Sequence, residues 1–161
     1  MRRQIHRRAG FTLVELVIAV LIMAILMLLA VPSMEGVLAD RRLRRSLDGF
    51  NRIVREAQER SIAERRPYLI VWFDGKVGLR AEGLARGEAS EPVVKMKLAR
   101  NESLKISFPS ALVEEPPPEW IFWPSGNCEP AIVSYQGKNG KWTASYSPLT
   151  AHGDIVAYVA K

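Results

Sequence analysis

Two kinds of hydrophobic pattern divide the chain. From Phe11 to Val31 the residues are almost all apolar, and Glu15 is the single charge. Further on, apolar residues recur at intervals of four, three, four and three, the spacing of one helical face. These residues are Leu43, Leu47, Phe50, Val54 and Ala57. After Tyr68, short apolar or alternating runs are separated by turn residues, which is typical of antiparallel strands. The pattern therefore predicts one long helix followed by a β-rich region.

The predicted helix covers residues 11–66 and has two parts. Residues 11–31 form the apolar part, and residues 32–66 form an amphipathic stalk. We expect the helix to be interrupted or kinked near Pro32, because proline removes a backbone hydrogen bond; a plain end of the apolar part is the alternative. Pro67 ends the helix, since the residue before a proline disfavours the α conformation. Acids and arginines four residues apart predict ion pairs on the exposed face: Asp48–Arg52, Arg52–Glu56, Glu56–Arg60 and Arg60–Glu64.

The region 67–161 is expected to form an antiparallel β head. Its predicted strands are Tyr68–Phe73, Val77–Glu82, Val93–Leu98, Leu104–Phe108, Trp120–Trp123, Ala131–Gln136, Trp142–Ser147 and Ile155–Val159. Asp74-Gly75-Lys76 and Asn139-Gly140 predict hairpin turns, and Gly83–Pro92 and Pro109–Glu119 predict loops. The expected fold class is α+β, with the long N-terminal helix packed through its apolar stripe on this head.

The apolar segment has the length of a membrane span. Its 21 residues rise about 1.5 Å each, roughly the 30 Å of a bilayer's hydrocarbon core. The arginines in residues 1–10 would keep the N-terminus in the cytoplasm and send the head outward. A cleaved signal peptide has a shorter apolar region and a small-residue cleavage site. A plain signal anchor fits the length but leaves Glu15 unexplained, and a buried soluble helix is disfavoured by the unbroken run Leu16–Val31.

Glu15 is the informative residue of this segment. A carboxylate inside an apolar span costs on the order of 2.5–3.5 kcal/mol, so such groups usually have a partner or a function. Cleavage between Gly10 and Phe11 would create an α-amino group four residues before Glu15. That amine, from the same or a neighbouring chain, would be a natural counter-ion.

These residues carry a resemblance to a known signal. A basic leader ending in Gly10, then Phe11-Thr12-Leu13-Val14-Glu15-Leu16 and an apolar helix, resembles the prepilin signal of type IV pilins and type II secretion pseudopilins. The resemblance implies cleavage after Gly10 by the prepilin peptidase, N-methylation of Phe11 and a role for Glu15 in docking the subunit into a filament. It also implies a kink at Pro32.

A second resemblance lies in the head. The stretch 122–156 has an aromatic–x–Pro–x–Gly turn, a Gly-containing hairpin and a Ser-Pro-Leu-Thr turn before the last strand. This order is similar to the GspH/FimT family of minor pseudopilins and pilus relatives. With the leader it covers about two-fifths of the chain. Thr150-Ala151-His152-Gly153 departs from the family, which more often places Gly directly after Thr.

Composition argues against catalysis. The single Cys128 excludes a disulfide framework and a zinc site on paired cysteines, and two histidines disfavour a histidine-rich metal site. The chain contains no nucleophile elbow, P-loop, dinucleotide fingerprint or metalloprotease helix. His152 and Asp154 are expected to lie in a surface loop. The aromatic residues of the head are expected to pack in the core rather than to form a binding patch: Trp120, Trp123, Trp142, Tyr135 and Tyr146. We expect no enzyme activity, cofactor or metal.

The formal charge of +6 is unevenly distributed. Residues 1–10 carry +4, 11–39 carry −2, 40–66 carry +4, and the head sums to zero. Removal of the leader would leave +2, and no aromatic interleaving or DNA-reading motif accompanies the arginines at 41–45. Nucleic acid is therefore not favoured as a partner.

The sequence as a whole predicts a structural subunit. The expected function is a minor pseudopilin of a type II secretion system, anchored in the bacterial inner membrane with a periplasmic head and assembling with other pseudopilins near the pseudopilus tip. The alternative is a FimT-type minor pilin of a type IV pilus that binds DNA for uptake. A generic signal-anchored envelope protein is the third possibility.

Overall fold

A single long helix precedes all the strands. The computed structural model describes residues 11–161 except 74, 84–91 and 110–118, and gives only the backbone at 29–35. Helix α1 extends from Leu13 to Glu64 without interruption. The interruption predicted near Pro32 is therefore wrong: proline removes one backbone hydrogen bond, and the bonds before and after it continue the helix. A kink without a break at Pro32 stays a prediction. The leader 1–10 lies outside the described residues.

The end of α1 follows its sequence signals. The residue after the helix, Arg65, has a φ of 52°, the left-handed conformation with which many helices end. Pro67 follows two residues later, as expected.

Only half of the predicted ion pairs on α1 form. Arg60 Nε lies 2.7 Å from Glu56 and Arg60 Nη1 lies 3.5 Å from Glu64, as predicted. The pairs of Arg52 with Asp48 and Glu56 are absent from the described contacts, so these two predictions are wrong. For Arg52–Glu56 the physical reason is competition, since the Glu56 carboxylate is already bound by Arg60. Nothing in the described contacts explains the missing Asp48–Arg52 pair.

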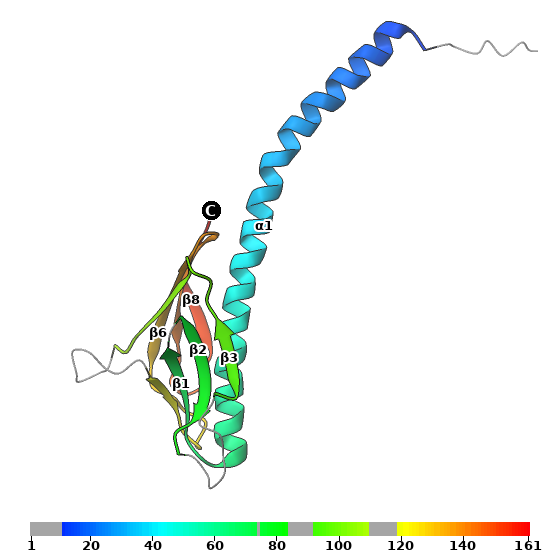
Figure 1. Ribbon diagram of the computed structural model, residues 1–161. Helices are drawn as coiled ribbons and strands as arrows, with labels where there is room; N and C mark the ends of the chain where they lie inside the picture. The colour runs from blue at the N-terminus through cyan, green and yellow to red at the C-terminus, as the bar shows by residue number, and fades with distance from the viewer. Residues whose placement is uncertain (1–10, 74, 84–91, 110–118) are drawn as a thin grey trace, which may run out of the picture. The chain divides into compact units, whose positions relative to one another are not determined.

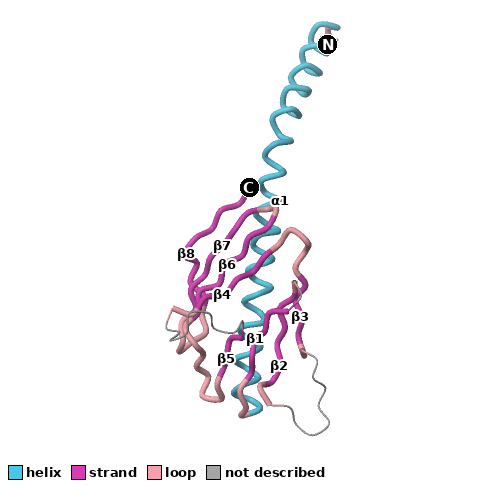
Figure 2. The backbone as a smooth tube through the Cα atoms, turned by 60° about the vertical axis from the view of Figure 1, so that its left-hand side comes forward, coloured by secondary structure: helices cyan, strands magenta, loops and turns pink. Residues whose placement is uncertain are grey.

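The β head consists of two antiparallel sheets of four strands, seen side by side in Figure 2. Sheet A has the order β3-β2-β1-β5, and sheet B has the order β4-β6-β7-β8. The strands are β1 Tyr68–Phe73, β2 Lys76–Ala81, β3 Val94–Lys97, β4 Ser103–Ser107, β5 Glu119–Phe122, β6 Ala131–Gly137, β7 Gly140–Tyr146 and β8 Gly153–Ala160. All eight lie where the sequence predicted them, with bounds shifted by up to two residues. Most residues of the two predicted loops, Gly83–Pro92 and Pro109–Glu119, lie outside the described residues.

Glycines occupy turn positions that other residues adopt at a cost. Gly126 and Gly140, which the sequence places in turns, have φ angles of 87° and 132°, in the region that glycine adopts without a steric cost. A Cβ at Gly140 would lie 2.1 Å from the carbonyl oxygen of Val159, so β8 approaches this turn too closely for any side chain.

The helix and both sheets share one hydrophobic core. The five stripe residues of α1 are all buried, and Ile53 joins them. Phe50 is fully buried at the centre, and its ring centroid lies 5.9–6.5 Å from those of Trp72, Trp120, Trp142 and Tyr146. The prediction that the head's aromatic residues form core is confirmed for Trp120, Trp142, Tyr135 and Tyr146, whereas Trp123 is only half-buried.

Three polar contacts complete the docking of α1 on the sheets. Trp142 Nε1 donates to Ser46 Oγ at 2.9 Å, Tyr146 Oη donates to Asn51 Oδ1 at 2.6 Å, and Tyr158 Oη donates to Asp40 Oδ1 at 2.8 Å. Trp142 and Tyr146 thus bury their rings and Tyr158 is half-buried, while the helix satisfies the polar atom of each side chain.

The chain separates into two compact units at the Val37–Leu38 peptide. The second unit, Leu38–Lys161, contains the latter half of α1 together with both sheets, and in Figure 1 this part of the helix runs along the strands. Among the residues that the structure describes, no helix is long and apolar enough to cross a membrane.

Candidate assembly site

The first turn of α1 is built around Thr12. Its carbonyl oxygen accepts the first helical hydrogen bond, from the amide of Leu16 at 3.2 Å. Its hydroxyl accepts a second bond, from the amide of Glu15 at 3.2 Å. These two bonds make Thr12 the N-cap residue, and with Glu15 three positions later the sequence matches a capping box. The helix therefore starts at a defined residue, directly after Phe11.

This start brings Phe11 and Glu15, two of the predicted site residues, to the same end of the helix. Phe11 precedes the cap and is 81% exposed. Glu15 is exposed in the first turn, where a negative charge interacts favourably with the helix dipole. Within the described part of the chain its carboxylate has no ion-pair or hydrogen-bond partner. Gly10 lies outside the described residues, and the Pro32 side chain is likewise not described.

The residues after the first turn are apolar and uncovered. Every large hydrophobic side chain described between Leu13 and Leu28 is exposed by about half or more, on all sides of the helix. A monomeric soluble protein rarely exposes a continuous apolar surface of this extent, and such surfaces mark sites of interaction.

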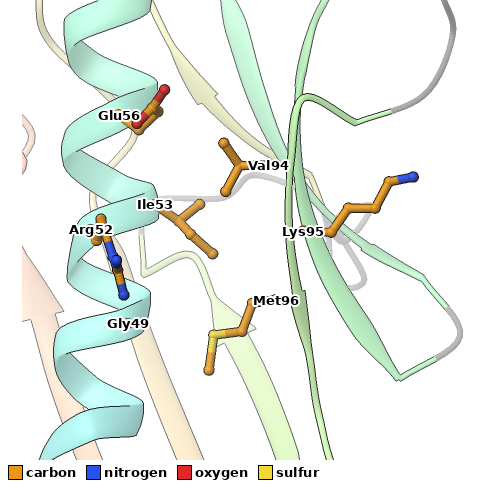
Figure 3. A pocket seen from close by; sticks show the side chains of 7 residues that line it. All are labelled: Gly49, Arg52, Ile53, Glu56, Val94, Lys95 and Met96. Atoms are coloured by element: carbon orange, nitrogen blue, oxygen red, sulfur yellow. The ribbon is translucent and has the colours of Figure 1, made fainter.

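Grooves flank α1 within the second unit. The first, of about 340 Å³, lies between α1 and β3. Figure 3 shows Val94 and Met96 pointing toward the helix, whereas Lys95 points away from it. Ile53 completes the apolar lining, and Gly49 leaves room because nothing lies within 4 Å of the position of its absent Cβ.

The second groove lies on the other side of α1, against β8. It measures about 300 Å³ and is lined by Arg44, Leu47, Asp48, Asn51, Gly153, Ile155 and Tyr158. Arg44 is held by Asp40, with Nε 2.9 Å from Oδ2, and its guanidinium lies 5.6 Å from the Tyr158 ring centroid. Hydrogen bonds from Arg44 and Tyr158 hold the pKa of the Asp40 carboxyl below its usual value.

Cys128, His152 and Asp154 line neither of these two grooves. Burial raises the pKa of the Cys128 thiol to about 11, so the thiol stays protonated and unreactive at neutral pH. His152 Nε2 lies 3.9 Å from Asp154 Oδ1 at the exposed surface, too far for a hydrogen bond. Over the described ranges, no three metal-ligating side chains cluster.

Sequence reasoning missed the β8 groove and the residues that form it. Tyr158 and Asp40 lie 118 positions apart, and only the tertiary fold brings them together. The available signal was a last strand with a single charge and several large apolar residues, which is unusual for a strand at the surface.

Comparison with known proteins supports the N-terminal motif and the fold separately. Residues 5–31 match the family described as the prokaryotic N-terminal methylation motif. Comparison with curated proteins finds no match.

Solved structures of similar fold include two kinds of minor subunit. The minor pseudopilin EpsH of the Vibrio cholerae type II secretion system is 14% identical, with a TM-score of 0.53 over 74% of this chain and 96% of that one. The type IV minor pilin FimU of Pseudomonas aeruginosa is 15% identical, with a TM-score of 0.53 over 73% of this chain and 90% of that one. The chain thus carries the prokaryotic N-terminal methylation motif on a pilin-like fold, the fold of the minor pseudopilin EpsH and the minor pilin FimU.

Proposed function

We propose that the protein is a minor pseudopilin of a type II secretion system, which assembles with other pseudopilins near the tip of the pseudopilus. The observation that carries the proposal is the methylation motif on a capped helix start. Phe11 lies just before the cap, and Glu15 in the first turn has no partner among the residues that the structure describes. The pilin-like head and the exposed apolar helix agree with it.

In this mechanism the prepilin peptidase cuts between Gly10 and Phe11, and the new amine of Phe11 is N-methylated. A secondary amine remains basic, so the methylated N-terminus keeps its positive charge. In an apolar environment that ammonium and the Glu15 carboxylate of a neighbouring subunit would each be costly alone. Their pairing offsets both costs and favours the register in which one subunit's first turn meets the next subunit's N-terminus.

The same proposal places the protein in the cell. Residues 11–31 would anchor the precursor in the inner membrane, with the arginines of the leader on the cytoplasmic side and the head in the periplasm. On assembly, the exposed apolar side chains would pass from lipid to the filament core, where helices of neighbouring subunits cover them. A kink at Pro32 would adjust the path of the helix between core and head.

The test combines processing with assembly. Glu15→Ala should leave membrane insertion and the mature N-terminus unchanged, because the cleavage signal and apolar segment are intact, but should abolish recovery of the chain in sheared filaments. Mass spectrometry should detect a mature chain that begins at N-methylated Phe11. An intact leader, or normal incorporation of the Glu15→Ala variant, would contradict the proposal.

A second candidate function is that of a type IV pilus minor pilin that binds DNA. Its support is the equal likeness to FimU and a set of exposed arginines on α1 with no partner among the described residues: Arg41, Arg42, Arg45, Arg52 and Arg55. Titration of the full-length protein with duplex DNA distinguishes the two. Micromolar binding that weakens steeply with salt would favour the pilin.

A further inference from the structure

The four edge strands of the two sheets are protected to different degrees. Edge strands present unpaired backbone N–H and C=O groups, and natural proteins usually shorten them or give them lysines to prevent pairing with other chains. The edges of sheet A, β3 and β5, have four residues each, and β3 contains two lysines. The edge strand β4 of sheet B has five residues with Lys105 at its centre. The opposite edge, β8, has eight residues and no lysine.

Strand β8 is also the most exposed and the most apolar of these edges. Within the described chain it pairs with β7 and with no other strand. Six of its eight residues are exposed, including Ile155, Val156 and Val159 at 56%, 67% and 45%. The pairing shifts between Thr143 and Ala144, which leaves Val156 as an extra, bulged residue. Beyond this bulge, Ala157–Ala160 form an uninterrupted edge.

The groove between α1 and β8 adjoins this edge. Its apolar lining comes from Leu47, Ile155 and the Tyr158 ring, and Ile155 is more than half exposed although it points toward the helix side of the sheet. A strand added to β8 would direct every second side chain toward this groove, because side chains alternate between the two faces of a sheet. The backbone edge and the groove are thus two parts of one surface.

We propose that β8 is an assembly surface at which an extended segment of a different, neighbouring subunit adds a fifth strand to sheet B. The proposal deepens the proposed function and rests on it. Free backbone groups specify the occupant, since another extended backbone is the partner that satisfies alternating N–H and C=O groups along a strand. Its apolar side chains would cover Ile155 and Val159.

Charge at the rim of the groove does not select the partner. Arg44 is engaged by Asp40, and Asp48 on the same rim also acts on the Arg44 guanidinium. Asp154 lies beside His152, and Arg55 lines the adjoining hollow. The free backbone edge and the apolar floor therefore carry the recognition, and the complementary segment is extended and apolar.

The test places a lysine on the free edge, the device by which natural edge strands avoid pairing. Val159→Lys is the test variant, because Val159 is exposed and contributes nothing to the core cluster. Ser103→Lys is the matched control, at an exposed position of β4 on the opposite edge of the same sheet. Both are made in the full-length chain and produced in cells that assemble the filament.

Val159→Lys should reduce the amount of chain in sheared filaments by about tenfold or more, while Ser103→Lys changes it less than about twofold. In both variants the mature N-terminus should be processed normally, which separates this inference from the proposed function. In the wild-type protein, backbone amides of Ala157–Ala160 should exchange hydrogen more slowly in filaments than in the isolated chain.

Three outcomes would overturn the inference while leaving the proposed function intact. The first is normal incorporation of Val159→Lys, and the second is unchanged amide exchange in β8 on assembly. The third uses Val159→Cys with a short bis-maleimide, to which the buried native Cys128 does not respond. A cross-link to a second copy of this chain would show that the occupant is not a different subunit.

Discussion

Phe50→Ala should lower the free energy of unfolding by about 3–5 kcal/mol, the usual cost of removing a fully buried phenylalanine ring. The full cost is expected because Phe50 has no exposed surface and its ring centroid lies within 6.5 Å of the centroids of four other rings. These rings come from β1, β5 and β7, so α1 and both sheets lose a shared contact. A domain of this size has about 5–15 kcal/mol of stability in total. Phe50→Leu retains most of the volume and should cost less than about 2 kcal/mol.

The assay is urea unfolding of the full-length protein in mild detergent, followed by tryptophan fluorescence. Three tryptophans, Trp72, Trp120 and Trp142, contact or surround the Phe50 ring, so the signal reports on this core. Glu59→Ala, at an exposed position of the same helix, should change stability by less than about 0.5 kcal/mol. A loss below about 1 kcal/mol for Phe50→Ala would refute the view that α1 is docked through this ring.

Three further predictions concern the ends of elements and buried groups. Arg65→Gly should raise stability by about 1 kcal/mol in thermal unfolding, because glycine adopts the left-handed conformation without a Cβ penalty; unchanged or lower stability would contradict it. Ser46→Ala should cost about 1–3 kcal/mol in urea unfolding by leaving the Trp142 indole N–H without its acceptor, whereas replacing the exposed Ser134 by Ala should cost little. Burial raises the pKa of the Cys128 thiol to about 11 from about 9 unfolded, so its contribution to stability is complete below pH 9 and is lost as the pH rises toward 11. Urea unfolding between pH 8 and 11 checks this, and Cys128→Ala should reduce the slope.

The sequence was most informative where structure is periodic. The stripe from Leu43 to Ala57 was predictable because 3.6 residues per turn places such positions on one face. The strands were predictable because turn residues bound each apolar run, and the prepilin-type motif predicted the α1 start. The interruption predicted at Pro32 was wrong, because the loss of one backbone hydrogen bond at a proline is outweighed by the helical hydrogen bonds on either side.

The parts that were not predictable depend on contacts between distant residues. The order of strands in a sheet decides which of them are edges, and no local pattern reveals that β8 is one. The choice of Arg60 as the partner of Glu56 depends on competition between two arginines at equivalent spacing. The sequence shows an alanine at position 151 where similar proteins more often have glycine, but it does not show the conformational strain. The structure places Ala151 at a φ of 51°, a left-handed conformation that glycine adopts more easily.

The three hydrogen bonds between α1 and sheet B have a consequence for the order in which the chain folds. Their partners are separated by 95, 96 and 118 residues, so most of the chain must be synthesised before any of them can form. Local helix formation takes microseconds or less, whereas non-local pairing waits for the closure of a long loop. The amphipathic half of α1 therefore forms before its apolar stripe is covered, and the cover is complete only when β7 and β8, the last two strands, join β1 and β5 around Phe50. Until then the newly made chain exposes part of an apolar helix face, and a chaperone that binds such faces would act in this interval.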